Sequence, residues 1–367
     1  MQFHFIARLL VAVAVFFVAF GGDVGRPILH SAYAIPPELQ YEGFGAATRG
    51  GEGQPVYRVT NLKDSGPGSL RDALARGNRM IVFAVQGEIA LRSEIRVKGA
   101  FITIDGFTAM SPGITIKNYG LYFLTAHDVI VRGLRIRNAK KDGIWITDGA
   151  YNIVIDHVSI SGSGDGNIDI TRVGTRDITI SWCILAEPAG EQKNMLLAFR
   201  SSRITLHHNL FTASSQRNPQ QTYDDEYGTK APDTTLDMRN NLIWNWGKNY
   251  GTRVRYGAKA NVVGNYYAAN GGDRNDALVI CKKGGPTSSA CDGGVPESFA
   301  QVYTQGNYSA DKVNLNSRGT EAKAFPAPAL SLSDAQSAAC DVFAEAGVRP
   351  LDNTDTHYLS RIVLSCP

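Results

Sequence analysis

The sequence has no run of lysines and arginines, and its formal net charge is only +3. Without a basic run there is no sign of an arm that binds nucleic acid. The small net charge permits an acidic ligand but does not require one. After residue 34 no apolar stretch is long enough to be a transmembrane helix. We therefore expect a monomer with no nucleic-acid partner. We also expect no membrane contact after removal of the first 34 residues, which are described next.

The first 34 residues differ from the rest of the chain. Residues 1–8 form a short segment with one arginine, and Leu9–Phe20 is almost wholly apolar. The segment Ala32–Ala34 has the small-x-small form of a signal-peptidase site. An uncleaved membrane anchor is the alternative, but the apolar run of about 12 residues falls short of the roughly 20 that span a bilayer. The sequence predicts a signal peptide over 1–34, export to the medium or the periplasm, and a single domain over 35–367.

Cysteine is scarce, with five residues in the whole chain. In an exported protein such a small set is best interpreted as disulfide pairs. Cys281 and Cys291 flank a loop of Gly, Pro and Ser, and Cys340 and Cys366 bracket the tail, so we predict these two bridges. Cys183 lies within an apolar strand, and nothing around it would lower its pKa, so we expect a buried thiol rather than a nucleophile.

Short hydrophobic strands recur every 24–32 residues between Val131 and Val262. A period of this length, with a strand and a turn in each unit, is typical of a solenoid. One unit cannot bury its apolar side alone, so the units stack around a continuous core. The strands contain Val131, Ile155, Ile180, Leu206, Met238 and Val262. The sequence therefore predicts an all-β solenoid that holds side chains from distant positions side by side, as a platform for a long polymer.

The two ends of the column are predicted to differ from its middle. A short helix capped by Ser69 should close the first coil. Coils should run over about 81–267, followed by a loop-rich tail over about 268–367. Within this tail we predict a helix near Ser333–Ala346, because Ser333 and Gln336 match a capping box.

Asn209, Asn241 and Asn265 occupy equivalent positions in their units. A ligand contact is one interpretation. We favour the other, in which stacked asparagines satisfy backbone groups at the turns that would otherwise be buried without partners.

Three aspartates, Asp142, Asp165 and Asp169, fall within two successive units of the repeat. Clustered carboxylates repel each other, and a hard cation with oxygen ligands relieves that repulsion. Calcium tolerates irregular geometry and accepts carboxylates together with water, so it suits an exported protein. The alternative is that these are ordinary solvated turn residues, since Asp165-Gly166-Asn167 is favourable turn chemistry.

Two cations should lie beside this cluster once the units are stacked. Lys193 precedes the strand that contains Leu206, and Arg217 follows it. Calcium, lysine and arginine on one wall could bind successive carboxylates of a polyuronate. A lone surface arginine is more often only a solvated charge, so this interpretation depends on the stacking.

Several motifs together resemble the secreted pectate lyases of polysaccharide lyase family 1, over roughly residues 41–367. The motifs are Phe44–Ala47, Val59–Leu62, Asp64–Leu74, Ile155–His157, Leu206–Phe211, Arg217–Pro219 and Asn240–Gly247. The resemblance implies a right-handed parallel β-helix and cleavage of polygalacturonate by β-elimination.

The resemblance also implies site residues. It assigns Asp142, Asp165 and Asp169 to Ca²⁺, Arg217 to the general base and Lys193 to a substrate carboxylate. Because a free guanidinium group is protonated below about pH 12, an arginine base implies activity at alkaline pH.

The chain departs from the family at one position. Many pectate lyases continue the base motif as Arg-x-Pro-x-x-Arg, whereas this chain has Thr222 in place of the second arginine. A threonine cannot hold a carboxylate with a bidentate fork. Lys230 or Arg239 could supply the missing cation and bind substrate.

Two other functions remain open from the sequence. A glycoside hydrolase could use Asp165 and Asp169 as acid and base, although Arg217 and Lys193 would then have no role. A non-catalytic polysaccharide-binding β-helix would retain the polymer without cleaving it. The sequence does not distinguish between unesterified galacturonan, methylated pectin and other uronans.

Overall fold

The computed structural model describes part of the chain, and its described residues fall in one compact unit. They are residues 40–190, 193–224, 226, 229–247, 250–270, 276–281, 291, 299–311, 313–316 and 318–366. The predicted signal peptide over 1–34 lies outside them. Within the described residues, no helix combines the length and the apolar character that crossing a membrane requires.

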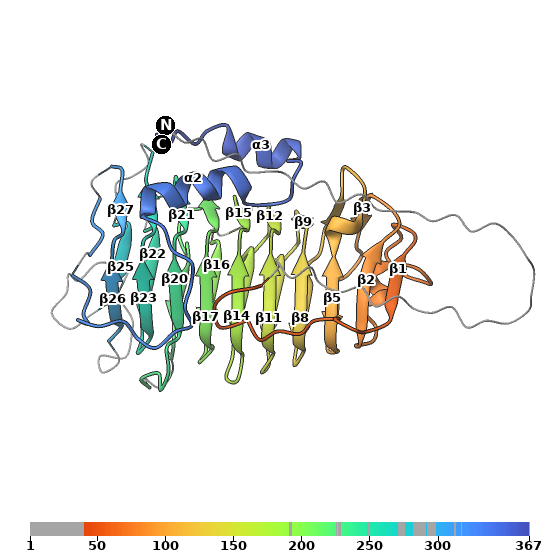
Figure 1. Ribbon diagram of the computed structural model, residues 1–367, viewed down its shortest axis with the longest axis horizontal. Helices are drawn as coiled ribbons and strands as arrows, with labels where there is room; N and C mark the ends of the chain where they lie inside the picture. Colours follow the sequence, from red (N-terminus) through yellow and green to blue (C-terminus); the bar gives the residue numbers. More distant parts are fainter. Residues whose placement is uncertain are drawn as a thin grey trace, which may run out of the picture. The chain divides into compact units, whose positions relative to one another are not determined.

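Three parallel sheets wind into a β-helix in which each coil adds one strand to each sheet (Figure 1). The ten-stranded sheet contains β1 (Val56–Val59), β2 (Arg79–Phe83), β5 (Ala100–Asp105), β8 (His127–Arg132), β11 (Tyr151–Asp156), β14 (Arg176–Ser181), β17 (Ser202–His207), β20 (Leu236–Arg239), β23 (Lys259–Val263) and β26 (Gln301–Gln305). The eight-stranded sheet contains β4 (Ile95–Val97), β7 (Leu121–Leu124), β10 (Ile144–Thr147), β13 (Ile168–Thr171), β16 (Met195–Ala198), β19 (Gln220–Thr222), β22 (Thr252–Arg255) and β25 (Leu278–Ile280). The nine-stranded sheet contains β3 (Gly87–Ala90), β6 (Ile114–Lys117), β9 (Leu134–Arg137), β12 (Ser159–Ser161), β15 (Ile184–Ala186), β18 (Leu210–Thr212), β21 (Leu242–Trp244), β24 (Tyr266–Ala268) and β27 (Tyr308–Ser309).

The core consists of columns of aliphatic side chains that repeat at the same strand position. Along the ten-stranded sheet, Ile104, Val131, Ile155, Ile180 and Leu206 pair in register from coil to coil. All five are fully buried. The apolar repeat in the sequence is therefore the core of the column, and the prediction of an all-β parallel β-helix is confirmed.

The strands extend beyond the range that the repeat suggested. They begin at Val56, before residue 81, and end at Ser309, after residue 267. The late strand β26 reads Gln-Val-Tyr-Thr-Gln, and of these residues only Val302 is buried. A strand with one buried apolar residue leaves almost no periodic signal, although backbone pairing with β23 still holds it in the sheet.

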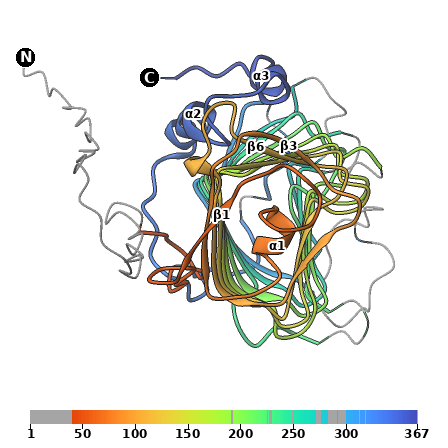
Figure 2. The same ribbon diagram turned by 90° about the vertical axis from the view of Figure 1, so that its right-hand side faces the viewer.

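The predicted capping helix is present as α1 (Leu70–Ala73), with the Ser69 side chain accepting from the Asp72 N–H at 3.2 Å. Its Leu70 and Ala73 are fully buried. Figure 2 shows α1 within the outline of the coils at one end of the column. A second short helix, η1 (Gly106–Thr108), follows β5. The helix α1 thus covers the apolar end of the first coil.

In the described part of the tail there are two helices rather than one. Helix α2 (Ala335–Glu345) is capped by Asp334, whose side chain accepts from the Gln336 and Ser337 N–H groups, so the predicted capping box at Ser333 is wrong. Asp334 competes better for those donors because its carboxylate accepts two N–H groups at once. Helix α3 (Asn353–Leu359) was not expected.

Both helices belong to a second apolar cluster on the nine-stranded sheet. Val342 of α2 and Leu359 of α3 are buried in one cluster with Leu210, Leu242 and Tyr266. Ion pairs add to this attachment, since Arg137 Nη2 of β9 lies 2.8 Å from Asp355 Oδ1 of α3. The tail therefore covers the outer face of the nine-stranded sheet.

The segment before β1 packs on the ten-stranded sheet. Backbone N–H groups of Phe44 and Gly45 donate to the hydroxyls of Thr205 and Thr179 at 3.0 and 2.9 Å. A β-carbon on Gly45 would lie 2.7 Å from the Thr179 nitrogen, so only glycine allows this approach. The segment before β1 and the tail helices thus cover two sheets, and the cavity described below opens on the third, the eight-stranded sheet.

The stacked asparagines of successive coils, Asn209, Asn241 and Asn265, form a hydrogen-bonded ladder as predicted. The Asn209 N–H donates to Asn241 Oδ1 and the Asn241 N–H to Asn265 Oδ1, each at 3.0 Å. The ladder continues to Asn307, which the sequence repeat had not included. These amides satisfy backbone groups in the buried turn, as expected for a structural role.

The cysteines also follow the prediction. The structure has disulfides between Cys281 and Cys291 and between Cys340 and Cys366. The thiol of Cys183 is free and buried, and the backbone N–H of Cys183 donates to Asn209 Oδ1 at 3.0 Å. Burial raises the pKa of the Cys183 thiol well above its usual range, so it remains protonated and unreactive.

Candidate functional site

The candidate site lies on the outer face of the eight-stranded sheet, where strand alternation directs every second side chain away from the core. Tyr122, Trp145, Asp169 and Leu196 pair in register on β7, β10, β13 and β16. Asp169 points outward because its neighbours Ile168 and Ile170 are buried in the core. A polar residue between two core isoleucines is thereby held at a defined place on the wall.

The three aspartates predicted as metal ligands line one cavity of about 500 Å³ on this face. The Gly166 N–H donates to Asp142 Oδ1 at 3.1 Å. A β-carbon at Gly166 would lie 2.4 Å from Asp169 Oδ1 and 3.3 Å from Asp142 Oδ1. Both carboxylates therefore converge on the one residue that has no side chain, and the more exposed Asp165 precedes it in the chain.

Burial, together with repulsion from a neighbouring carboxylate, favours the protonated forms of Asp142 and Asp169. Removal from water, aided by Asp165, raises the pKa of Asp142 to about 6. Burial and the charge of Asp142 raise the pKa of Asp169 well above its usual value, while Arg217 opposes that rise. A cation among these oxygens would relieve the same repulsion. The donor set of carboxylate oxygens therefore fits calcium.

The carboxylates alone do not form a complete metal cage. Within the part of the chain that the structure describes, no three His, Cys, Asp or Glu side chains meet the geometry of a metal-binding group. Calcium takes six to eight oxygen ligands and readily accepts water among them. Asp142, Asp165 and Asp169 would therefore be partial ligands, with water or a ligand carboxylate completing the shell.

Lys193 and Arg217 lie together beside the aspartates. Lys193 forms a parallel bridge with Gln216, the residue before Arg217. Partial burial and the charge of Arg217 lower the pKa of the Lys193 amine, while Asp165 and Asp169 act in the opposite direction. The two predicted cations thus lie near enough to the carboxylates for their charges to affect one another's pKa values, which agrees with the stacking argument.

Lys230 and Arg239 do not line this cavity. Arg239 ends β20 in the ten-stranded sheet, where its Nε lies 2.8 Å from Asp237 Oδ1. Lys230 is exposed in the connection between β19 and β20, and its α-carbon lies against Gly257, after β22. Arg239 is therefore not placed to replace the missing arginine, because β20 belongs to a different sheet. Lys230 lies close to the end of β22 in the eight-stranded sheet, and its role as the replacement stays a prediction.

Thr222 is buried at the end of β19, where its hydroxyl accepts from Gln220 Nε2 at 2.9 Å. In the next coil, Arg253 and Arg255 pair in register with Gln220 and Thr222. Arg253 Nη2 donates to Gln220 Oε1 at 2.5 Å, and the Tyr250 hydroxyl donates to the same oxygen at 2.7 Å. The sequence interpretation missed this polar group, which the register of the repeat could have located.

Aromatic side chains also line the cavity and were not expected. Tyr122 and Trp145 form an edge-to-face pair with ring centroids 5.4 Å apart. The Trp145 Nε1–H donates to Thr171 Oγ1 at 2.9 Å, which fixes the orientation of the indole. The cavity therefore combines carboxylates with rigid aromatic surface, a mixture that suits a sugar ligand.

Comparisons with known proteins agree with this architecture. No family model matches the chain. A protein named "Probable pectate lyase C" from Emericella nidulans is 36% identical over 246 residues, which cover 66% of this chain and 55% of that protein. The chain thus spans about half the length of the curated relatives that it matches most strongly. Pectate lyase 1 of Cryptomeria japonica is 28% identical over 72% of this chain and 75% of its own length.

Solved structures share the fold. The pectate lyase of Bacillus sp. N165 in complex with trigalacturonate has a TM-score of 0.61 at 20% identity, covering 84% of this chain and 98% of that one. The major allergen from cedar pollen has a TM-score of 0.63 at 22% identity, covering 84% and 92%. By sequence over two thirds of its length and by its parallel β-helix, the chain is a homologue of proteins named pectate lyase.

Proposed function

We propose that the protein is an exported, calcium-dependent lyase that cleaves a polygalacturonate-type acidic polysaccharide by β-elimination. The observation that carries this proposal is the gathering of Asp142, Asp165 and Asp169 with Lys193 and Arg217 on one face of the eight-stranded sheet. A hydrolase would use the carboxylates but would leave both cations without a role. The relatives named pectate lyase support the choice of reaction.

Calcium would be held by Asp142, Asp165 and Asp169. Burial raises the pKa of Asp142 and of Asp169, a neighbouring carboxylate adds to each rise, and a cation would remove that repulsion. When bound, calcium would neutralise a uronate carboxylate and make the adjacent C–H more acidic. The chain's own residues would supply everything else in the reaction.

Lys193 would pair with the uronate carboxylate and orient the sugar. Arg217, in the neutral form that alkaline pH favours, would accept the proton from the carbon next to that carboxylate. As this C–H bond breaks, its electrons form a carbon–carbon double bond and the glycosidic C–O bond on the next carbon breaks. The leaving sugar oxygen takes up a proton, so the products are one unsaturated end and one new reducing end. The positive charges beside the site would stabilise the negative charge that develops on the substrate.

One assay separates the candidate functions. The purified protein is incubated with unesterified galacturonan, methylated pectin and other uronans, with calcium or with chelator. A lyase produces ultraviolet absorbance from the new double bond, in calcium only. New reducing ends without absorbance would indicate a hydrolase. Calcium-dependent retention on the polymer without any cleavage would indicate a binding protein.

Export is a separate part of the proposal and has its own test. The support is the apolar run Leu9–Phe20 followed by Ala32–Ala34. The exported protein should begin at Ile35 when its N-terminus is sequenced. A mature protein that still carries Leu9–Phe20 would refute the predicted signal peptide.

A further inference from the structure

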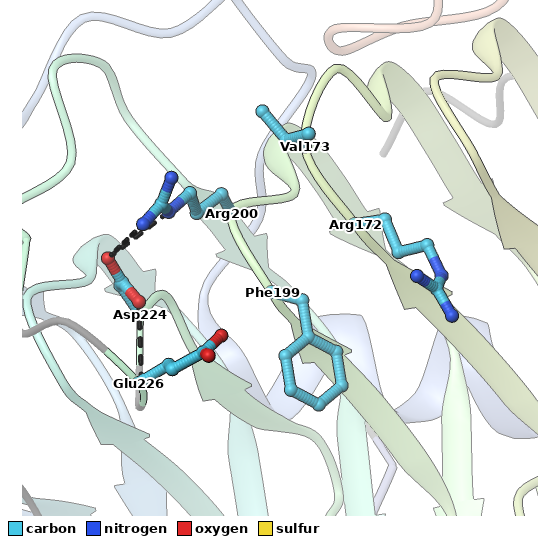
Figure 3. A pocket seen from close by; sticks show the side chains of 6 residues that line it. All are labelled: Arg172, Val173, Phe199, Arg200, Asp224 and Glu226. Carbon is cyan, nitrogen blue, oxygen red and sulfur yellow. Dashed lines mark hydrogen bonds and ion pairs between the residues drawn. The ribbon is translucent and has the colours of Figure 1, made fainter.

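A second cavity adjoins the candidate site. It measures about 400 Å³ and lies where the chain leaves β13, β16 and β19. Its lining residues are Arg172, Val173, Phe199, Arg200, Asp224 and Glu226 (Figure 3). Arg172 and Phe199 also line the carboxylate cavity, so the two hollows form one continuous surface. Arg172 follows Asp169 by three residues, which is roughly 10 Å along an extended strand.

Phe199 gives this surface an apolar platform. The residue is 49% exposed, although large hydrophobic side chains are normally removed from water. In Figure 3 its ring extends from the wall in roughly the same direction as the Arg172 side chain. The C–H face of a pyranose ring is apolar and flat, so it can cover such a ring and exclude water from it.

The two arginines of the cavity differ in how firmly they are held. Arg200 Nη2 lies 3.0 Å from Asp224 Oδ2, and the Asp224 side chain is only 4% exposed. Arg172 Nε lies 3.3 Å from Asp148 Oδ1, but the side chains are 60% and 42% exposed. An exposed ion pair of this kind contributes little and exchanges easily. Arg172 can therefore turn from Asp148 to the carboxylate of a ligand and hold it with its planar fork.

We propose that Phe199 and Arg172 form a second sugar subsite, in which Phe199 stacks on a uronate ring and Arg172 binds its carboxylate. The subsite would take the part of the polymer that extends beyond the carboxylate cavity. This inference rests on the proposed function for its ligand class. It goes beyond that function because neither residue takes part in the chemical step.

The test compares short and long ligands on Phe199→Ala and Arg172→Gln. Both changes are made in an Arg217→Lys background, which the proposed mechanism makes slow, and affinities for di- and hexagalacturonate are measured in calcium by calorimetry. Digalacturonate should occupy the carboxylate cavity alone, whereas hexagalacturonate should cross both. Phe199→Ala should weaken hexagalacturonate binding about tenfold, as for loss of the contact of a half-exposed ring. Arg172→Gln should also weaken hexagalacturonate binding. Because Arg172 and Phe199 border the carboxylate cavity as well, digalacturonate binding should weaken too, but by a much smaller factor than hexagalacturonate binding.

Matched controls exist elsewhere on the column. Phe107 is 47% exposed and lies against His157, away from the eight-stranded sheet. Lys117 on the nine-stranded sheet forms a surface ion pair with Glu88 at 3.2 Å, as Arg172 does with Asp148. Phe107→Ala and Lys117→Gln should leave both affinities unchanged.

Three results would overturn the subsite. They are an unchanged hexamer affinity in Phe199→Ala, an equal loss for both ligands, and an equal loss in the controls. A parent protein that binds neither ligand would overturn the galacturonan substrate and the subsite with it. Ultraviolet absorbance that appears at a near-normal rate in the Arg217→Lys background would instead refute Arg217 as the base, and the comparison of affinities by ligand length would still decide the subsite.

Discussion

Asp142 and Asp169 come from successive coils, yet both direct an oxygen at Gly166. The place where a β-carbon would stand is 2.4 Å from Asp169 Oδ1 and 3.3 Å from Asp142 Oδ1. Any side chain at residue 166 would push the carboxylates apart. The glycine therefore permits a crowded pair of acids. Burial is the main cause that raises the pKa of each acid, and the charge of Asp142 adds to the rise at Asp169.

Asp169→Asn is expected to abolish calcium-dependent binding of a uronan while leaving the fold intact, because the column is built from its apolar repeats. The measurement is retention on a galacturonan gel with calcium and with chelator. Asp237→Asn is the matched control, since burial also raises the pKa of Asp237 but it lies in the ten-stranded sheet. Asp237→Asn should keep its response to calcium. Full activity of Asp169→Asn in chelator would refute the metal assignment.

The pH dependence of calcium stabilisation follows from the same carboxylates. In the folded protein the pKa of Asp142 is about 6, whereas an unfolded aspartate titrates near pH 4. The folded state binds more protons between these values, so without calcium the free energy of unfolding falls as the pH rises through this window. Calcium needs the deprotonated forms. The increase in melting temperature on adding calcium should be small near pH 4.5 and large near pH 8.

Thermal melts with calcium and with chelator at each pH test this expectation. The comparison cancels other titrations, such as that of His207, whose pKa burial lowers to about 4. His207 alone would make the protein less stable as the pH falls from about 6.5 toward 4, with or without calcium. A calcium effect of the same size at every pH would show that Asp142 and Asp169 are not the ligands.

Arg217→Lys should lower the rate of the chemical step at least about a hundredfold, the usual scale of general-base catalysis. Lysine keeps the positive charge but loses the planar geometry and reach of arginine. Binding of the polymer should weaken far less, because Lys193 remains. Initial rates of ultraviolet absorbance and a separate binding measurement test the two effects. Arg239→Lys is the control, since Arg239 pairs with Asp237 in another sheet and should leave the rate unchanged. Near-normal turnover of Arg217→Lys would mean that another residue is the base.

Reduction of the Cys340–Cys366 disulfide should loosen the tail before the column. The bridge ties α2 to the chain end across 26 residues, and removing a disulfide of this size typically costs about 2–4 kcal/mol. Helices α2 and α3 pack on a small outer cluster, whereas the coils share the main core. Hydrogen exchange after reduction should rise first in α2 and α3. Equal exchange throughout the chain would indicate that the tail and the column unfold together.

The structure also changes one expectation about Thr222. From the motif alone, an arginine at this position would be expected to tighten binding of unesterified galacturonan. Thr222 is buried, however, and lies in register with Arg255, with Arg253 two residues earlier on the same strand. An added arginine would meet like charge in a confined space. Its effect on stability is therefore expected to outweigh any gain in binding.

The sequence by itself determined the features that depend on local pattern or on the repeat. The apolar period identified the coils, because Val131, Ile155 and Ile180 must share one core. The asparagine ladder and both disulfides followed from equivalent or bracketing positions. The sequence did not predict the weakly apolar strand β26 or helix α3. Both elements are held by pairing and packing with distant segments rather than by a pattern in their own residues.

Only the tertiary structure decided which residues face the carboxylate cavity together. Arg239 was assigned there by its place after Arg217 in the chain, but its strand belongs to another sheet. The register between coils brings together a polar group of Gln220, Tyr250 and Arg253. Phe199 and Arg172 line one cavity because they follow two neighbouring strands of the same sheet. In a solenoid the apolar period sets which residues are buried. The register between coils sets which outward residues become neighbours, and that register follows from backbone pairing and core packing along the whole column.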